Sequence, residues 1–120
     1  MISALLVLLL LQPVPSAADA SAVVNADGTV DVYMTISNPT MYDIYVTSAT
    51  SEAAGKIELR NGDKPAKEFT VTAYEGLELK AGGMLLRLSD VKGALKAGET
   101  VRVTMMTDGG VTIVATAVVK

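Results

Sequence analysis

The chain has 120 residues, contains neither histidine nor cysteine, and carries 10 basic against 13 acidic side chains, a net charge of −3. Without imidazole or thiol groups it has no His- or Cys-based catalysis, no thiolate metal site and no disulfide. A slightly acidic chain is not attracted to phosphate backbones, so nucleic acid is not expected as a partner.

The chain begins with a segment that is typical of an export signal. Residues 2–11 form an almost unbroken apolar run, about half of the roughly 20 residues that a membrane-spanning helix needs. Two prolines follow, and the stretch ends in Ala18-Asp19-Ala20, an A-x-A cleavage pattern. We therefore predict a signal peptide at residues 1–20 and a mature domain at residues 21–120. That domain is expected to be periplasmic or otherwise exported and not inserted in a membrane.

Two features keep alternatives open at this end. The segment carries no Lys or Arg, which departs from the usual signal and is compatible with a start codon further upstream. The apolar run could also be an uncleaved anchor or a buried strand.

Strict alternation of apolar and polar residues predicts a half-buried strand at residues 29–37. An Asp-Gly pair before it supplies the positive φ of a tight hairpin turn, and Pro39 ends it because proline cannot donate to a ladder. The apolar positions of this strand, expected to face the core, are Val30, Val32, Met34 and Ile36.

Further alternating runs bring the count to eight or nine short strands, with turn signals about every ten residues. In the next run, Tyr42, Ile44 and Val46 are expected to share one face. No stretch of about 12 mature residues keeps a helical period. The sequence therefore predicts one all-β domain, an antiparallel Greek-key β-sandwich, expected to be a monomer. The further runs lie at residues 41–49, 56–60, 68–74, 77–80, 84–88, 100–107 and 111–119.

The residues offer little for catalysis. A serine nucleophile needs a base beside it, usually histidine, and none is present. Acid pairs such as Glu58 with Glu68 fit solvated strand faces better than a catalytic cleft. The Gly-rich turns join strands to strands and provide no helix N-terminus for a phosphate. We therefore predict that the protein is not an enzyme.

Methionine is the one soft metal donor in the chain, and its thioether suits Cu(I). By alternation Met34, Met84 and Met105 fall on inward faces, where methionine is ordinary core filler. Only Met41 and Met106 are expected to face outward, on separate strands. The prediction is core packing, and a copper site made of methionines alone is the alternative.

Several stretches, taken in order, carry a family resemblance. They include residues 33–38 (YMTISN), 53–59 (AAGKIEL), 77–83 (LELKAGG) and 95–104 (LKAGETVRVT). Through their order and spacing the chain resembles the PCu(A)C family of exported periplasmic copper chaperones. The resemblance covers nearly all of the mature domain and implies a cupredoxin-like β-sandwich.

The sequence departs from that family at the metal site. There, a histidine after Glu-Leu of the middle strand and a His-x-Met after Gly-Gly hold Cu(I) with further methionines. The matching positions here are Arg60, Leu85 and Arg87. A guanidinium is always protonated and has no lone pair to give a cation. The resemblance thus implies a degenerate site with no metal ligands and no cofactor, unless copper is held by other residues.

The resemblance also brings the three substituted positions to one rim. We expect a small cationic spot beside an exposed Leu85, with Arg60 pairing to Glu58 or another acid. One hypothesis is contact with another exported protein or an anion at Glu58, Arg60, Leu85 and Arg87. The others are a copper carrier that uses unrelated methionines and a structural or secretion-associated domain without a specific site.

Overall fold

The structure, a computed structural model, describes residues 13–120, so most of the predicted signal peptide lies outside the described residues. Ten strands and no helix make up the described part of the chain. The strands are β1 (Ser16–Val24), β2 (Val30–Ser37), β3 (Ile44–Thr50), β4 (Ala54–Asn61), β5 (Lys64–Pro65), β6 (Phe69–Val71), β7 (Gly76–Leu79), β8 (Met84–Val91), β9 (Thr100–Thr107) and β10 (Thr112–Val119).

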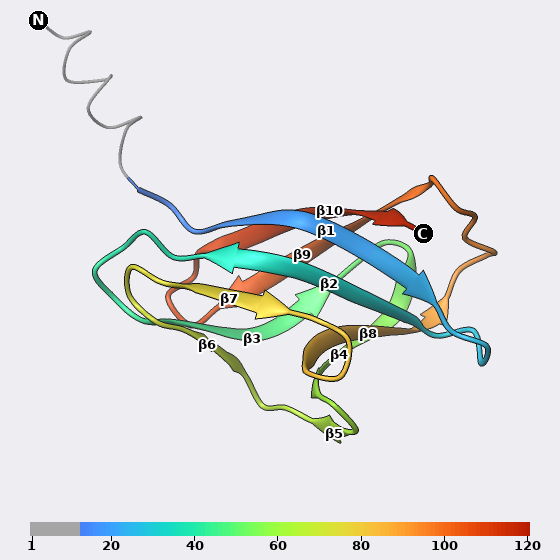
Figure 1. The fold of residues 1–120 in the computed structure, drawn as a ribbon, viewed down its shortest axis with the longest axis horizontal. Helices are drawn as coiled ribbons and strands as arrows, with labels where there is room; N and C mark the ends of the chain where they lie inside the picture. Colours follow the sequence, from blue (N-terminus) through green and yellow to red (C-terminus); the bar gives the residue numbers. More distant parts are fainter. Residues whose placement is uncertain (1–12) are drawn as a thin grey trace, which may run out of the picture.

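The strands form one sheet in the order β5-β4-β8-β2-β1-β10-β9-β3-β6, and β7 pairs with the second half of β2 (Figure 1). The sheet curls back on itself, so that β3 and β4, far apart in this order, are in contact and the inward faces enclose one core. The predicted all-β sandwich is confirmed. Residues 13–120 contain no helix that is long and apolar enough to cross a membrane.

Two details of the predicted sandwich are wrong. The strands number ten instead of eight or nine, partly because the two-residue β5 is too short to show alternation. The sheet is also not purely antiparallel, because β1 and β10 run parallel, with Ser21 opposite Val118 and Ala22 opposite Val119. The parallel pair arises because β1 lies between β2 and β10 in the sheet.

The core follows the predicted alternation of β2. Its four inward side chains are at most 2% exposed. The same pattern continues in β9 and β10, and Phe69 of β6 is among the largest fully buried side chains. Each Å² of apolar surface that these side chains bury stabilises the fold by about 25 cal/mol, and this burial is the main stabilising contribution. The inward residues of β2 are Val30, Val32, Met34 and Ile36.

The second predicted strand begins late. Residues 38–43 form a loop, β3 starts at Ile44, and Tyr42 is 72% exposed instead of sharing the inward face. The cause is the buried Asn38, whose side-chain amide donates to the carbonyl oxygens of Tyr42 at 2.7 Å and Val71 at 2.9 Å. These bonds hold the loop against β6 and satisfy groups that a longer strand would have paired.

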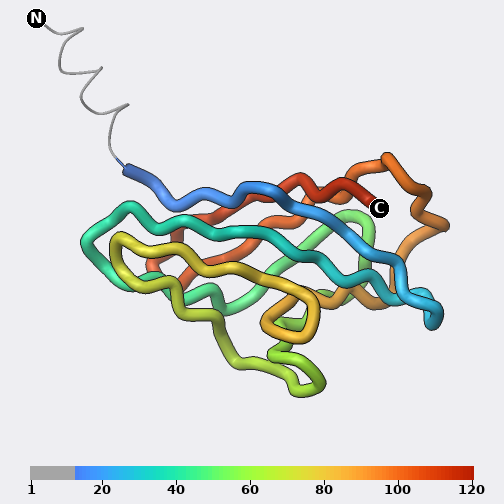
Figure 2. Tube along the Cα trace, viewed as in Figure 1, coloured from blue at the N-terminus to red at the C-terminus, as the bar shows by residue number. Residues whose placement is uncertain are grey.

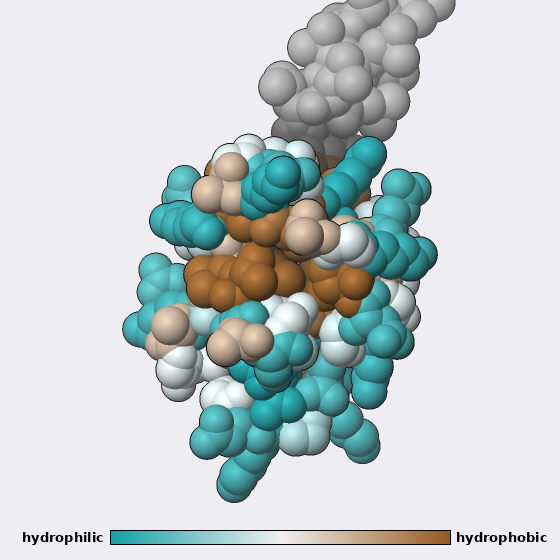
Figure 3. Space-filling model, turned by 90° about the vertical axis from the view of Figure 1, so that its right-hand side faces the viewer, coloured by the Kyte–Doolittle hydropathy of each residue, from teal (hydrophilic) through white to brown (hydrophobic). Residues whose placement is uncertain are grey.

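The two ends of the sandwich differ. At one end, residues 38–43 and 72–75 form neighbouring loops beside the start of β1 (Figure 2). The opposite end contains the β1–β2 turn and the long β8–β9 connection, and apolar surface there is ringed by hydrophilic residues (Figure 3). Val91 and Leu95 lie in this region and pack partly buried against the core. The polar site described next lies along β2, β8 and β4.

Candidate functional site

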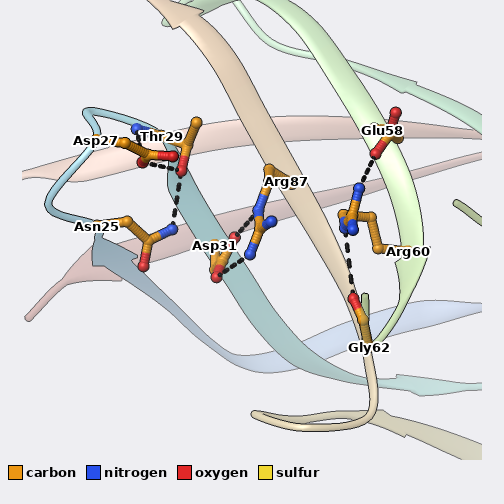
Figure 4. Close-up of polar contacts among 8 residues, drawn as sticks. All are labelled: Asn25, Asp27, Thr29, Asp31, Glu58, Arg60, Gly62 and Arg87. Carbon is orange, nitrogen blue, oxygen red and sulfur yellow. Dashed lines mark hydrogen bonds and ion pairs between the residues drawn. The ribbon is translucent and has the colours of Figure 1, made fainter. Parts of the chain in front are cut away.

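The register of three neighbouring strands brings the predicted site residues onto one face. Between β4 and β8, Arg60 lies opposite Leu85 and Glu58 opposite Arg87. Between β2 and β8, Asp31 also lies opposite Arg87. Because side chains at paired positions project to the same face, all five share one surface. Figure 4 shows the four charged ones. Arg60 and Arg87 are diagonal neighbours, a relation that typically separates two residues by about 7–8 Å and their Cβ atoms by somewhat less.

Arg87 forms an ion pair with Asp31, a residue that alternation along β2 assigns to the outer, solvated face of that strand. Its Nε donates to Asp31 Oδ1 at 2.8 Å and its Nη2 to Asp31 Oδ2 at 3.0 Å. Asp31 is only 5% exposed, whereas the side chain of Arg87 is 34% exposed. This two-pronged geometry is the strongest form of a guanidinium–carboxylate pair, because two parallel charge-assisted bonds fix both groups.

The electrostatics of Asp31 follow from this partner. Burial alone would raise the pKa of the carboxyl group, and it is the largest single effect. The hydrogen bonds and charge of Arg87, helped by Asn25 and Arg60, outweigh it, so the pKa of Asp31 is lowered. The same hydrogen bond raises the pKa of Arg87. Both groups therefore stay charged at neutral pH.

Arg60 is paired as well. It forms an ion pair with Glu58, two residues earlier on β4, and its Nε donates to the carbonyl oxygen of Gly62 at 3.4 Å (Figure 4). The pairing with Glu58 that the sequence suggested is confirmed. Each guanidinium on this face therefore has a carboxylate partner, and the expected cationic spot is wrong, because two positive charges meet two negative ones.

The expectation of an exposed leucine is also wrong. Leu85 is 4% exposed. It lies on β8 directly opposite Arg60 of β4, one residue before the stretch of β8 that pairs with β2. A short side chain in the middle of a sheet is covered when its neighbours are long, and alternation along one strand does not reveal what those neighbours are.

Sequence reasoning missed the role of Asp31. The only signal was one carboxylate in a strand whose core-facing positions are all apolar, and alternation assigns it to the outer face. Outer-face residues of a central strand are covered by neighbours on both sides, so Asp31 is buried although it points away from the core. Its partner lies 56 residues later in the chain, and only the strand order shows it.

The arrangement has the chemistry of a structural network. Within residues 13–120, no group of three or more His, Cys, Asp or Glu side chains is placed to hold a metal ion. Every buried side-chain nitrogen or oxygen in that range has a hydrogen-bond partner. The site therefore consists of charged groups that bind one another: Asp31–Arg87 joins β2 to β8, and Glu58–Arg60 lies within β4.

The methionines divide as predicted between core and surface. Met34 is 2% and Met105 0% exposed, and Met84 packs partly buried against the core. Met41, in the loop after β2, is 62% exposed, and Met106 on β9 is half-buried. The two core thioethers are thus enclosed by apolar side chains.

Comparison with known proteins gives a family and a fold. The model of a family described as "Putative lipoprotein LpqE-like" matches residues 14–119. No curated protein sequence matches the chain.

Solved structures of PCuAC domains and of a Cu(I)-bound protein are similar in fold. The copper-bound PCuAC domain from PmoF2 has a TM-score of 0.77 at 12% identity, covering 87% of this chain and 90% of that domain. The apo PCuAC domain from PmoF1 has a TM-score of 0.77 at 18% identity, covering 87% and 91%. The solution structure of Cu(I)-DR1885 from Deinococcus radiodurans has a TM-score of 0.72 at 29% identity, covering 89% and 76%. The expected PCuAC-like fold is confirmed.

Proposed function

The chain belongs to the LpqE-like family, and we propose that it is an exported protein that keeps the fold of a PCuAC copper chaperone without that fold's Cu(I) site. One observation carries the proposal. At a position that the resemblance assigns to a copper-binding methionine, Arg87 is engaged by both oxygens of the buried Asp31. The family's description as a lipoprotein supports export.

The donor chemistry supports the loss of copper binding. Arg60 and Arg87 have no lone pair to give, and the Leu85 side chain has no donor atom. The nearby oxygens belong to Asp31 and Glu58, which are hard ligands and already accept hydrogen bonds from the arginines. Cu(I) prefers soft sulfur and imidazole ligands, so it has no reason to displace these bonds.

Binding to another protein is the activity that we propose for this domain. The ion pairs leave a third of the Arg87 side chain and a third of the Glu58 side chain exposed. A partner could therefore contact this face without breaking either pair. We accordingly propose a monomeric binding module acting on another exported protein, not an enzyme.

Titration with Cu(I) under reducing conditions, in competition with a chromogenic chelator, tests the loss of copper binding. The expected result is no complex tighter than micromolar. The Met41→Leu/Met106→Leu double variant is the control for a site made of other methionines, because it removes the two thioethers outside the core. Tight stoichiometric uptake that this double variant leaves undiminished would contradict the proposal.

Protein contact through this face has its own test. Arg60→Gln removes a positive charge from the face, and Arg102→Gln, at an exposed position on β9, is the matched control. Recovery of an exported partner that copurifies with the wild-type protein should fall at least fivefold with the first variant and stay within twofold with the second. Equal recovery with both variants would contradict this contact face.

A further inference from the structure

Strand β1 consists of two halves that are held very differently. In residues 21–24 it pairs on one side with β2 and on the other with β10, through Ser21 opposite Val118 and Ala22 opposite Val119. Ala22 is fully buried, and its carbonyl oxygen accepts a bond from the backbone N–H of Lys120. This half is an integral, central part of the sheet.

The first half, residues 16–20, contributes much less. Its register pairs are with the end of β2, from Ser16 opposite Ser37 to Ala18 opposite Thr35. Its side chains are all small, and only two of them, Ala17 and Ala20, pack partly buried against the core. Losing two half-buried methyl groups costs at most about 1–2 kcal/mol of apolar burial.

The two halves meet at an irregularity. The register between β1 and β2 shifts between Ala18 and Ser21, and Asp19 within this gap has a φ of 55°. A non-glycine residue in the left-handed region costs roughly 1 kcal/mol, so this point is the weakest in the strand. It coincides with Ala18-Asp19-Ala20, the cleavage pattern predicted from the sequence alone.

Removal of residues 1–20 would open the sheet at an internal position. The end of β2 would keep β7 on one edge, with Ile36 opposite Leu77 and Ser37 opposite Gly76. On its other edge, Thr35 and Ser37, whose backbone groups alternate with those of Ile36 and Asn38 that face β7, would lose their partner strand. Because β1 lies between β2 and β10 in the sheet order, the result is a gap inside the sheet that is bounded by the open edge of β2 (Figure 1). On its far side, β10 forms register pairs only with Ser21 and Ala22, which stay in place.

We propose that processing after Ala20 turns this gap into a strand-acceptor slot, which takes an extended segment of another exported protein with alanine-sized side chains at the inward positions. Unpaired strand edges bind extended chains through backbone hydrogen bonds, and pockets for alternate side chains select the sequence. Residues 16–20 show what the slot fits, because Ala17 and Ala20 are the two that point toward the core. The inference rests on the proposed export and protein-binding function and assigns that function a second surface.

The first part of the test concerns the exported protein itself. Intact mass and N-terminal sequencing of the protein recovered after export should give a chain that begins at Ser21. A first residue at or before Ser16 would leave β1 whole and would overturn the proposal. The Cu(I) titration does not depend on this result, so failure of the slot and failure of the proposed loss of copper binding are distinguishable.

The second part uses a peptide probe with the sequence of residues 13–20, PVPSAADA. Added to the mature protein, it should slow amide hydrogen exchange at Thr35 and Ser37 at least tenfold and leave the β9–β10 ladder unchanged. A peptide with Ala17→Trp should bind at least tenfold more weakly, because residue 17 is half-buried. A peptide with Ala18→Trp is the matched control and should bind within twofold of the original, since residue 18 is exposed.

The outcomes separate clearly. Slowed exchange with discrimination against tryptophan at position 17 alone supports the slot and its size selection. Unchanged exchange at millimolar peptide overturns the slot. Equal weakening, or no weakening, by tryptophan at both positions overturns the requirement for small inward side chains.

Discussion

Replacing Asp31 by Asn tests how much the Asp31–Arg87 pair, which joins β2 to β8, contributes to the stability of the fold. Exposed ion pairs contribute about 0–1 kcal/mol, and breaking a buried pair costs about 3–5 kcal/mol. Here the aspartate side chain is 7% exposed and the arginine side chain 34% exposed, so the pair lies between these limits. We expect Asp31→Asn to lower the free energy of unfolding by about 2 kcal/mol at pH 7.

The reverse change should cost more. Arg87→Met leaves the nearly buried Asp31 carboxylate without its partner, whereas Asp31→Asn leaves an arginine that can still reach water. We therefore expect about 3 kcal/mol for Arg87→Met. The double variant should lose less than the sum of the two single variants, by about 1–2 kcal/mol, because both remove the same interaction.

The pH dependence gives a second, independent check. The folded-state pKa of Asp31 is lowered from its ordinary value of 3.8, so the unfolded chain takes up this proton first as the pH falls. The stability that Asp31 contributes is thus fully present above about pH 4 and is lost as the pH falls through the folded-state pKa. The difference between wild type and Asp31→Asn should shrink accordingly between pH 5 and pH 2.

Urea unfolding, with m-values compared between variants, measures these differences. A cost below about 0.5 kcal/mol for Asp31→Asn at pH 7 would refute the reasoning, because the pair would then behave as a surface ion pair. An undiminished cost at pH 2 would refute the role of the ionised carboxylate.

Three further changes probe the loops and one close contact. Asn38 is 1% exposed, and Asn38→Ala removes the hydrogen bonds that its side chain donates to the carbonyl oxygens of Tyr42 and Val71. The change should destabilise the protein by about 2–3 kcal/mol and speed amide exchange in residues 38–43. Tyr74 has a φ of 63° and is 71% exposed, so Tyr74→Gly should relieve about 1–2 kcal/mol of backbone strain and lose about 0.5–1 kcal/mol through the greater entropy of the unfolded chain. A melting temperature lower than that of the wild type would count against this strain. Gly55→Ala places a Cβ 2.9 Å from the Cβ of Asp90, so it should cost about 1–3 kcal/mol in urea unfolding, and a neutral result would mean that β8 moves freely.

The core of the fold could be predicted because it depends on short-range pattern. Alternation assigned the inward face of β2 correctly, and the glycine-rich turn at residues 108–110 marked the hairpin between β9 and β10. The extent of β3 could not be predicted, because it is set by Asn38, whose partner Val71 lies 33 residues away. β1 was missed as a long strand because its first half consists of small residues without alternation.

Part of the site's membership could be predicted from the sequence, and the charge state of the site could not. The resemblance brought Arg60, Leu85 and Arg87 together, and the strand register places them on one face. Whether Arg87 is free or paired depends on the strand that lies next to β8, and the spacing of residues does not reveal strand order. Asp31 was therefore absent from the predicted site although it decides the site's charge.

The account depends most on the claim that arginine side chains occupy the positions of soft copper donors. The most direct test is a side-by-side Cu(I) competition titration of the wild type and a triple variant with Arg60→His, Leu85→His and Arg87→Met, which supplies imidazole and thioether donors at those positions. The account predicts no complex tighter than micromolar for the wild type and at least tenfold tighter binding for the triple variant. Tight Cu(I) binding by the wild type that the triple variant does not improve would contradict it.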